Sequence, residues 1–268
     1  MKKKILIPTD FSKNAWNALV YATELYKREE VDFYLLNAYG NDRKTFPKEY
    51  AEKELKKLMQ RLSITAVYPG HTFFTIPVFN TLINGIKDIV ESKDIEMVIM
   101  GTKGETMAKN TIYGSNAIDA MEHVRNCPVL AVPENVVYID PNEIVFPTSF
   151  KTHYKSRELK HLYEISRITN APVRILNVQN KKGLNPTQQN NKDLLEECLE
   201  GIDYSFHWME NLNVQEGLVK FVTERNSQMI AFINKKHFFF GSVFSNPMVK
   251  MLGMYAEVPI LALHDLRN

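Results

Sequence analysis

The stretch ILIPTDFS, residues Ile5–Ser12, reappears without a gap as IVFPTSFK at Ile144–Lys151. Later stretches match in the same order: LLNAY with ILNVQ (35–39 and 175–179), and CPVLAVPE with VPILALHD (127–134 and 258–265). The distance along the chain between the matching stretches, from Ile5 to Ile144, is that of a whole domain, whereas the repeat units of solenoids are much shorter. The sequence therefore predicts two copies of one domain.

The predicted domains are residues 1–138 and 139–268, with a linker near Asn135–Pro141. A chain of 268 residues with 44% hydrophobic side chains is long enough to bury two cores of ordinary size. Its 33 basic and 31 acidic residues are interleaved, so neither a nucleic-acid partner nor an acidic membrane surface is expected. Two cysteines exclude a disulfide framework and favour the reducing cytoplasm.

Within each copy, short runs of β-branched and apolar residues alternate with helical patterns. In the first copy, five runs are expected to be buried strands: KKILIPT, DFYLLNAY, FFTIPVF, EMVIMG and PVLAVP. Ser12 is the expected N-cap of the helix that follows the first run. Strict alternation predicts a doubly wound α/β fold, in which a parallel sheet with right-handed crossovers carries helices on both faces.

Ligands of such sheets bind at the carboxyl ends of the strands, where the stretch GTKGETMAKNTIYGSN lies (101–116). Gly101 and Gly104 allow the backbone to approach a ligand closely. Gly114 and Ser115 open the next helical pattern, whose unpaired N–H groups and dipole suit a phosphate. The spacing matches neither the Walker motif nor the dinucleotide motif. The alternative is that these glycines only form a loop and a helix cap.

Together, ILIPTDFS, LLNAY, VIMGTKG, GSNA and CPVLAVP resemble the universal stress protein family in its tandem-domain form. The resemblance covers nearly the whole chain and is weaker in the second copy. It implies five-stranded sheets of order 3-2-1-4-5, with domains that pair through their last strands. It also implies an adenine nucleotide, ATP in many members, with an accompanying Mg²⁺ left open.

Carried over by position, the resemblance implies a nucleotide pocket in the first copy. Its residues are Pro8, Thr9, Asp10, Ala38, Met100, Gly101, Gly104, Gly114, Ser115 and Asn116. Lys103 and Lys109 are charges near the expected phosphates, with solvated loop lysines as the alternative. Asp10 suits ribose hydroxyls or the adenine amino group, and helix capping is its alternative role.

The second copy departs from this pattern. Ser149 stands where Asp10 stands, and the segment 233–250 lacks paired glycines, so we expect no nucleotide there. Phe238–Phe240 are expected to fill the vacated cleft, with an exposed docking patch as the alternative. Lys235, Lys236 and His237 are interpreted as a solvated cluster.

The remaining histidine, cysteine and tryptophan side chains indicate no catalytic or metal site. The histidines are scattered without metal-ligand spacing, Cys127 has no acid–base partner in sequence, and Trp16 and Trp208 are expected in the core. We expect a cytoplasmic protein that binds a nucleotide without turning it over. A slow ATPase or nucleotide-processing enzyme, and an interaction protein without nucleotide, are the alternatives. The expected partners are the nucleotide and the paired second domain, with a homodimer left open.

Overall fold

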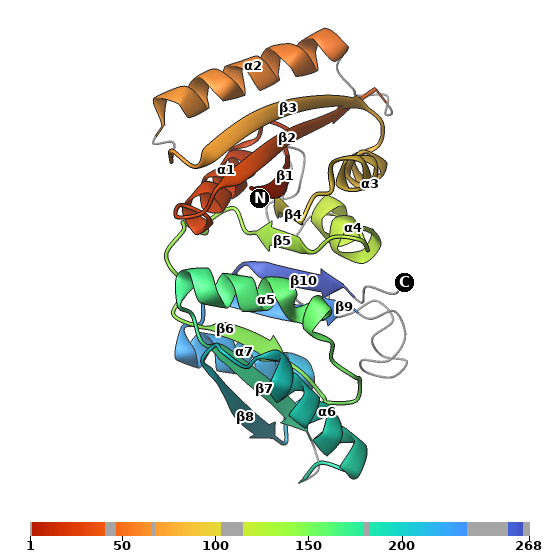
Figure 1. The fold of residues 1–268 in the computed structure, drawn as a ribbon, viewed down its shortest axis with the longest axis vertical. Coiled ribbons are helices and arrows are strands. Elements are labelled where there is room, and N and C mark those ends of the chain that lie inside the picture. Colours follow the sequence, from red (N-terminus) through yellow and green to blue (C-terminus); the bar gives the residue numbers. More distant parts are fainter. Residues whose placement is uncertain are drawn as a thin grey trace. The chain divides into compact units, whose positions relative to one another are not determined.

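The structure, a computed structural model, describes residues 2–40, 47–65, 68–102, 115–179, 183–234 and 257–264. The chain divides into two compact units, residues 1–138 and 139–268 (Figure 1). Each is an α/β unit in which all the paired strands run parallel. The tandem doubly wound fold class expected from the sequence is thereby confirmed.

The first unit alternates strands and helices along the chain. Its elements are β1 (Lys3–Pro8), α1 (Lys13–Leu25), β2 (Val31–Tyr39), α2 (Lys48–Ile64), β3 (His71–Phe79), α3 (Leu82–Lys93), β4 (Met97–Gly101), α4 (Ser115–His123) and β5 (Val129–Val132). Strand pairing gives the order β3-β2-β1-β4-β5. The strands β4 and β5 are almost wholly buried, whereas most residues of the edge strand β3 are half-buried or exposed.

Helices cover this sheet as their apolar stripes predict. Helix α1 packs against β4 and β5, helix α2 against β2 and β3, and helix α3 against β1 and β2 beside α4 (Figure 1). In α2 the buried side chains include Leu55, Leu58 and Leu62, which share one face of the helix. Ser12 is the N-cap of α1, as expected, because its side chain accepts a hydrogen bond from the Ala15 N–H.

Among the described residues, the second unit repeats this order of elements as far as its fourth strand. Its elements are β6 (Ile144–Pro147), α5 (Ser156–Thr169), β7 (Val173–Gln179), α6 (Pro186–Cys198), β8 (Tyr204–Glu210), α7 (Val214–Arg225), β9 (Met229–Asn234) and β10 (Ile260–His264). Strand pairing gives the order β8-β7-β6-β9-β10, so that β8 is the edge strand that corresponds to β3.

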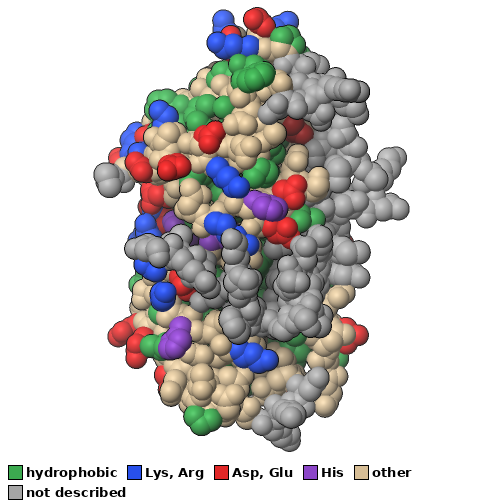
Figure 2. Space-filling model, turned by 90° about the vertical axis from the view of Figure 1, so that its right-hand side faces the viewer, with side chains coloured by type: hydrophobic (Ala, Val, Ile, Leu, Met, Phe, Trp, Pro, Cys, Tyr) green, Lys and Arg blue, Asp and Glu red, His purple; other side chains and the backbone are tan. Residues whose placement is uncertain are grey.

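Charge on the surface is mixed in sign. Figure 2 shows Lys and Arg side chains interspersed with Asp and Glu on the visible face, in keeping with the net charge of +2. Among the described residues, no helix combines the length and the apolar character needed to cross a membrane.

Candidate functional site

The expected site lies at the carboxyl edge of the first unit's sheet, at its topological switch point. Strand β1 pairs with β2 on one side and with β4 on the other. After β1 the chain continues to β2 and β3 at one edge of the sheet, and after β4 it continues to β5 at the opposite edge. Ligands of open α/β sheets bind outside the strand ends at such a point. The loop after β1 and the end of β4 lie on its two sides.

The loop after β1 is held by a set of short local bonds. The Thr9 N–H donates to the Leu36 carbonyl at 2.8 Å, and the Asn37 side-chain amide donates to the Thr9 carbonyl at 2.7 Å. The Thr9 hydroxyl accepts from the Phe11 N–H at 3.0 Å, and Phe11 takes a left-handed backbone with φ 66°. A non-glycine residue in this region marks a turn that its surroundings dictate. The loop therefore has a defined shape.

Asp10 is exposed at the tip of this loop. Its carboxylate accepts a hydrogen bond from the Ser12 N–H at 3.1 Å, which places it just before the first turn of α1. The N-cap of α1 is Ser12, two residues further along the chain, so Asp10 is not the N-cap residue. The carboxylate still faces solvent at the carboxyl edge of the sheet.

The end of β4 lies on the other side. Met100 is buried, and Gly101 closes the strand. An ideal Cβ at Gly101 would lie 2.8 Å from Asn14 Cγ and 3.0 Å from the Asn14 carbonyl oxygen. A side chain here would force Asn14 to shift, so glycine favours the packing of α1 against β4 whether or not a ligand binds. The next residue, Thr102, is 1% exposed, and its hydroxyl has no hydrogen-bond partner among the described residues.

The structure brings together the expected site residues on β1, β2 and β4, since these strands are neighbours. Ala38 lies near the carboxyl end of β2, two residues beyond the Leu36 that pairs with Pro8. Ser115 and Asn116 form the exposed first turn of α4. Lys103, Gly104, Lys109 and Gly114 lie outside the described residues. Sequence reasoning missed Asn14, Asn37 and Phe11, although the last two recur at the matching positions of the second copy as Asn177 and Phe150.

The second unit keeps the same loop. Thr148 donates its N–H to the Leu176 carbonyl at 2.8 Å, and its hydroxyl accepts from the Phe150 N–H at 3.1 Å. The Asn177 amide donates to the Thr148 carbonyl at 2.7 Å, and Phe150 has φ 55°. Two amides of α6 add further bonds, from Gln188 to the Ser149 carbonyl and from Asn191 to the Phe150 carbonyl, each at 2.8 Å.

The connection from this loop to the next helix differs between the units. Helix α1 begins one residue after Ser12, whereas α5 begins only at Ser156 and its N-cap, Lys155, makes no side-chain capping bond. The longer connection inserts Tyr154, which is 4% exposed and hydrogen-bonds the Thr148 hydroxyl. The segment 235–256, with the aromatic run expected to fill the second cleft, lies outside the described residues.

Other expectations from the sequence have mixed outcomes. Cys127 is buried, and burial raises the pKa of its thiol, which suits an inert core residue. The prediction that Trp208 lies in the core is wrong, because its side chain is 43% exposed on the edge strand β8. Trp16 is half-buried, with the Arg61 guanidinium 3.6 Å from its ring centroid.

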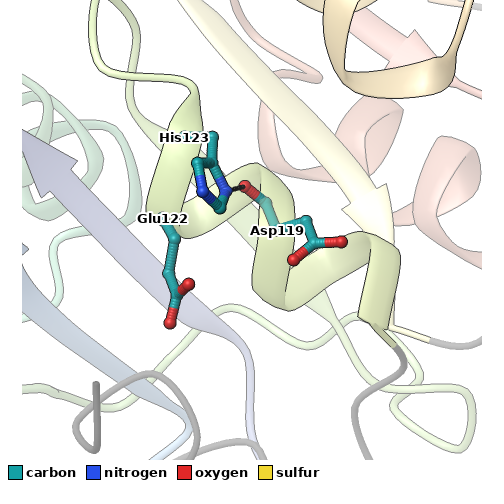
Figure 3. Close-up of side chains that lie close together, drawn as sticks. All are labelled: Asp119, Glu122 and His123. Atoms are coloured by element: carbon teal, nitrogen blue, oxygen red, sulfur yellow. Dashed lines mark hydrogen bonds between the residues drawn. The ribbon is translucent and has the colours of Figure 1, made fainter.

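One group of potential metal ligands also emerges. Asp119, Glu122 and His123 on α4 have ligand atoms within 4.8 Å of one another. Figure 3 shows the two carboxylates pointing in different directions, while His123 Nδ1 donates to the Asp119 carbonyl at 2.9 Å. Ligands of a bound zinc ion lie at about 2.0–2.2 Å from the metal and converge on it. Exposed acidic groups commonly lie this close together without a metal, so the group carries no metal assignment.

Comparison with known proteins gives a consistent picture. Residues 1–133 match the model of the universal stress protein family. A universal stress protein of Methanocaldococcus jannaschii is 26% identical over 141 residues, which cover 48% of this chain and 81% of that protein. The structure resembles a crystal structure of a universal stress protein from Archaeoglobus fulgidus with a TM-score of 0.70 and 15% identity, covering 97% of this chain and 98% of the other.

A second solved structure has the same fold over nearly the whole chain. It is a putative universal stress protein from Pseudomonas aeruginosa, with a TM-score of 0.64 and 11% identity, covering 98% of this chain and 93% of that one. At these identities the two solved structures establish the fold alone.

Proposed function

Since the chain belongs, through residues 1–133, to the universal stress protein family, we propose that its first unit binds an adenine nucleotide, ATP or a relative of it, in a cytoplasmic stress response. The observation that carries the proposal is that β1 and β4 are neighbouring parallel strands, so the loop after β1 and the end of β4 lie at the same edge of the sheet. The exposed carboxylate of Asp10 and the backbone of Gly101 belong to these two strand ends, which supports a shared ligand site. The G-x2-G-x9-G-S spacing from Gly101 to Ser115 supplies the phosphate side.

Each part of the site has a proposed role. Asp10 accepts hydrogen bonds from the ribose hydroxyls or the adenine amino group, since an ionised carboxylate is only an acceptor. Ala38 leaves room for the base to lie against the backbone. The N–H groups at the start of α4, near Ser115, receive phosphate oxygens together with the helix dipole. Mg²⁺ would accompany the phosphates, but none of the described residues argues for its position.

We propose binding rather than turnover. Phosphoryl transfer needs an anchored metal and an oriented nucleophile or base. The described side chains of the site offer one carboxylate, Asp10, which is exposed and occupied with the Ser12 N–H. A slow ATPase would reveal itself as ADP or AMP after incubation with ATP and Mg²⁺.

The proposal is tested on the full-length protein in two ways. Mass spectrometry of freshly purified, denatured protein should release an adenine nucleotide, and calorimetry should give one site per chain. Asp10→Asn should weaken binding several-fold, whereas the matched variant Ser149→Ala in the second unit should leave it unchanged. If no nucleotide co-purifies and ATP, ADP and AMP give no heat at millimolar concentration, the proposal fails. The alternative of an interaction protein without nucleotide would then remain.

We further propose that the second unit does not bind nucleotide and serves as a partner for the first. Ser149 lacks the charge of Asp10, and the inserted Tyr154 replaces the first helical turn that borders the site in the first unit. Two nucleotides per chain in the calorimetric titration would contradict this. Pairing of the units through their last strands, and a homodimer of the whole chain, stay predictions.

A further inference from the structure

A chain of polar contacts runs along the amino edge of the second unit's sheet. It begins at Glu143, which precedes β6 and is 4% exposed. The Glu143 carboxylate accepts four hydrogen bonds: from Arg225 Nε at 2.8 Å and Nη2 at 2.7 Å, from Ser227 Oγ at 2.6 Å, and from Arg174 Nε at 3.1 Å. One buried carboxylate thus joins the end of α7 to the starts of three strands.

The chain continues to the edge strand. Arg174 Nη1 donates to Ser205 Oγ at 2.9 Å, and Ser205 Oγ lies 2.8 Å from His207 Nε2. Because an arginine only donates, Ser205 Oγ accepts from Arg174. The neutral imidazole can accept the Ser205 proton at Nε2, whereas the protonated ring carries a donor there and cannot. The ring of His207 also packs edge-on against Phe221 of α7, with 5.1 Å between the ring centroids.

The charges around His207 oppose a positive ring. Burial lowers the pKa of His207 below its usual 6.5, and the neighbouring Arg225 and Arg174 lower it further, against a smaller opposite effect of Glu143. These groups come from the elements packed around it: Arg174 from β7, Arg225 from α7, and Glu143 from the start of β6. Two arginines against one glutamate already leave the cluster with an excess positive charge.

We propose that this chain of contacts is an acid-sensitive latch: protonation of His207 places a third cation beside two arginines, deprives the Ser205 proton of its acceptor and loosens α7 from β7 and β8. The latch comprises Glu143, Arg174, Ser205, His207, Arg225 and Ser227. The stabilisation by the neutral ring is complete above pH 6.5, and it is lost as the pH falls from 6.5 through the lower pKa of the folded state.

The first unit lacks this arrangement, although its sheet has the same layout. Arg174 pairs with Ser205 across β7 and β8, and at the matching place Tyr34 pairs with Phe74 across β2 and β3. These two rings stack with 5.1 Å between their centroids and carry no titratable group near neutral pH. The acid response of the latch should therefore be confined to the second unit.

Hydrogen exchange of the full-length protein at pH 7.5 and pH 5.5, corrected for the intrinsic effect of pH, tests the latch. In the wild type, protection of α7 and β8 should fall several-fold at the lower pH, more than that of β6. His207→Gln retains an acceptor for Ser205 but cannot become charged, so its α7 and β8 should not respond. The control His123→Gln, at an exposed histidine of the first unit, should respond like the wild type.

A second measurement uses the wild-type protein alone and does not depend on the folding of a variant. The His207 ring protons, followed by NMR in the wild type, should titrate below pH 6.5. A midpoint at or above 6.5 would overturn the proposal, as would equal protection of α7 and β8 at the two pH values. An unchanged acid response in His207→Gln would place the responsible group elsewhere and would overturn it too.

Discussion

Gly101 faces Asn14 so closely that an added Cβ would lie 2.8 Å from the Asn14 Cγ atom. This contact joins the end of β4 to the first turn of α1. A glycine at this position can serve the close packing of the protein or the close approach of a ligand, and a sequence alone does not distinguish the two roles. Measurements of stability without any ligand can distinguish them.

Gly101→Ala should lower the free energy of unfolding by about 1–3 kcal/mol without any nucleotide, because overpacking forces neighbouring atoms apart. Asn14→Ala removes two of the three close atoms and should restore part of the loss in the double variant. Chemical denaturation of the wild type, the two single variants and the double variant gives the coupling. A double variant whose loss equals the sum of the single losses would contradict the packing role.

The helix caps of the two units make a matched pair. Ser12→Ala removes a capping bond of 3.1 Å to the Ala15 N–H and should cost about 1 kcal/mol. Lys155 has an extended backbone and no side-chain capping bond, so Lys155→Ser should stabilise the second unit by about 0.5–1 kcal/mol. Thermal unfolding measures both. A destabilised Lys155→Ser would show that the α5 terminus is held in another way.

Glu143 makes the second unit sensitive to strong acid. Burial alone would raise its pKa, but the hydrogen bonds from Arg225, Ser227 and Arg174 outweigh burial and lower the pKa to about 2 from its ordinary 4.5. Its stabilisation is therefore full above pH 4.5 and is lost as the pH falls from 4.5 toward about 2.

Glu143→Gln should lower stability at pH 7 by about 2 kcal/mol, as expected for hydrogen bonds to a charged group, and should flatten the pH dependence of unfolding below 4.5. Glu197→Gln, at an exposed position of α6, is the matched control and should leave the curve unchanged. Parallel acid curves for Glu143→Gln and the wild type would contradict the assignment.

His71 gives the first unit its own titration. Its Nε2 lies 3.0 Å from the Tyr26 carbonyl and its Nδ1 has no hydrogen-bond partner among the described residues, so the ring is neutral with the proton on Nε2. Burial lowers its pKa, against smaller opposite effects of the Tyr26 carbonyl and Glu24.

NMR should find a His71 midpoint below 6.5 and the Nε2–H tautomer at neutral pH. The stability that the neutral ring contributes is complete above 6.5 and declines below it. His71→Phe should reduce this decline in the first unit without altering exchange in α7 and β8. A midpoint above 6.5 would mean that the ring gains a partner on protonation.

Much of the fold could be predicted from the sequence because its signals are local. The apolar runs that became β1, β4 and β5 are nearly continuous, and Ser12 lies directly before a helical pattern. The part of the candidate site at the ends of β1, β2 and β4 could be predicted too, since the carboxyl ends of parallel strands meet at one edge of the sheet.

The remaining features depend on register and on sheet position. Arg174, Ser205 and His207 come together only because β7 and β8 pair in one particular register. Trp208 looks like a core residue by composition, and its exposure follows from the edge position of β8. Asp119, Glu122 and His123 do occur at helical spacing, but their sequence does not tell how their side chains point.

The loop shared by Thr9 and Thr148 has a consequence for reading related sequences. Both copies keep the threonine turn, the left-handed phenylalanine and the supporting asparagine, although only one keeps the aspartate. The turn thus forms with either residue between threonine and phenylalanine, an aspartate in one copy and a serine in the other. Its shape depends on the threonine, the phenylalanine and the asparagine, so the charge at the intervening position can differ while the backbone bonds around it stay the same.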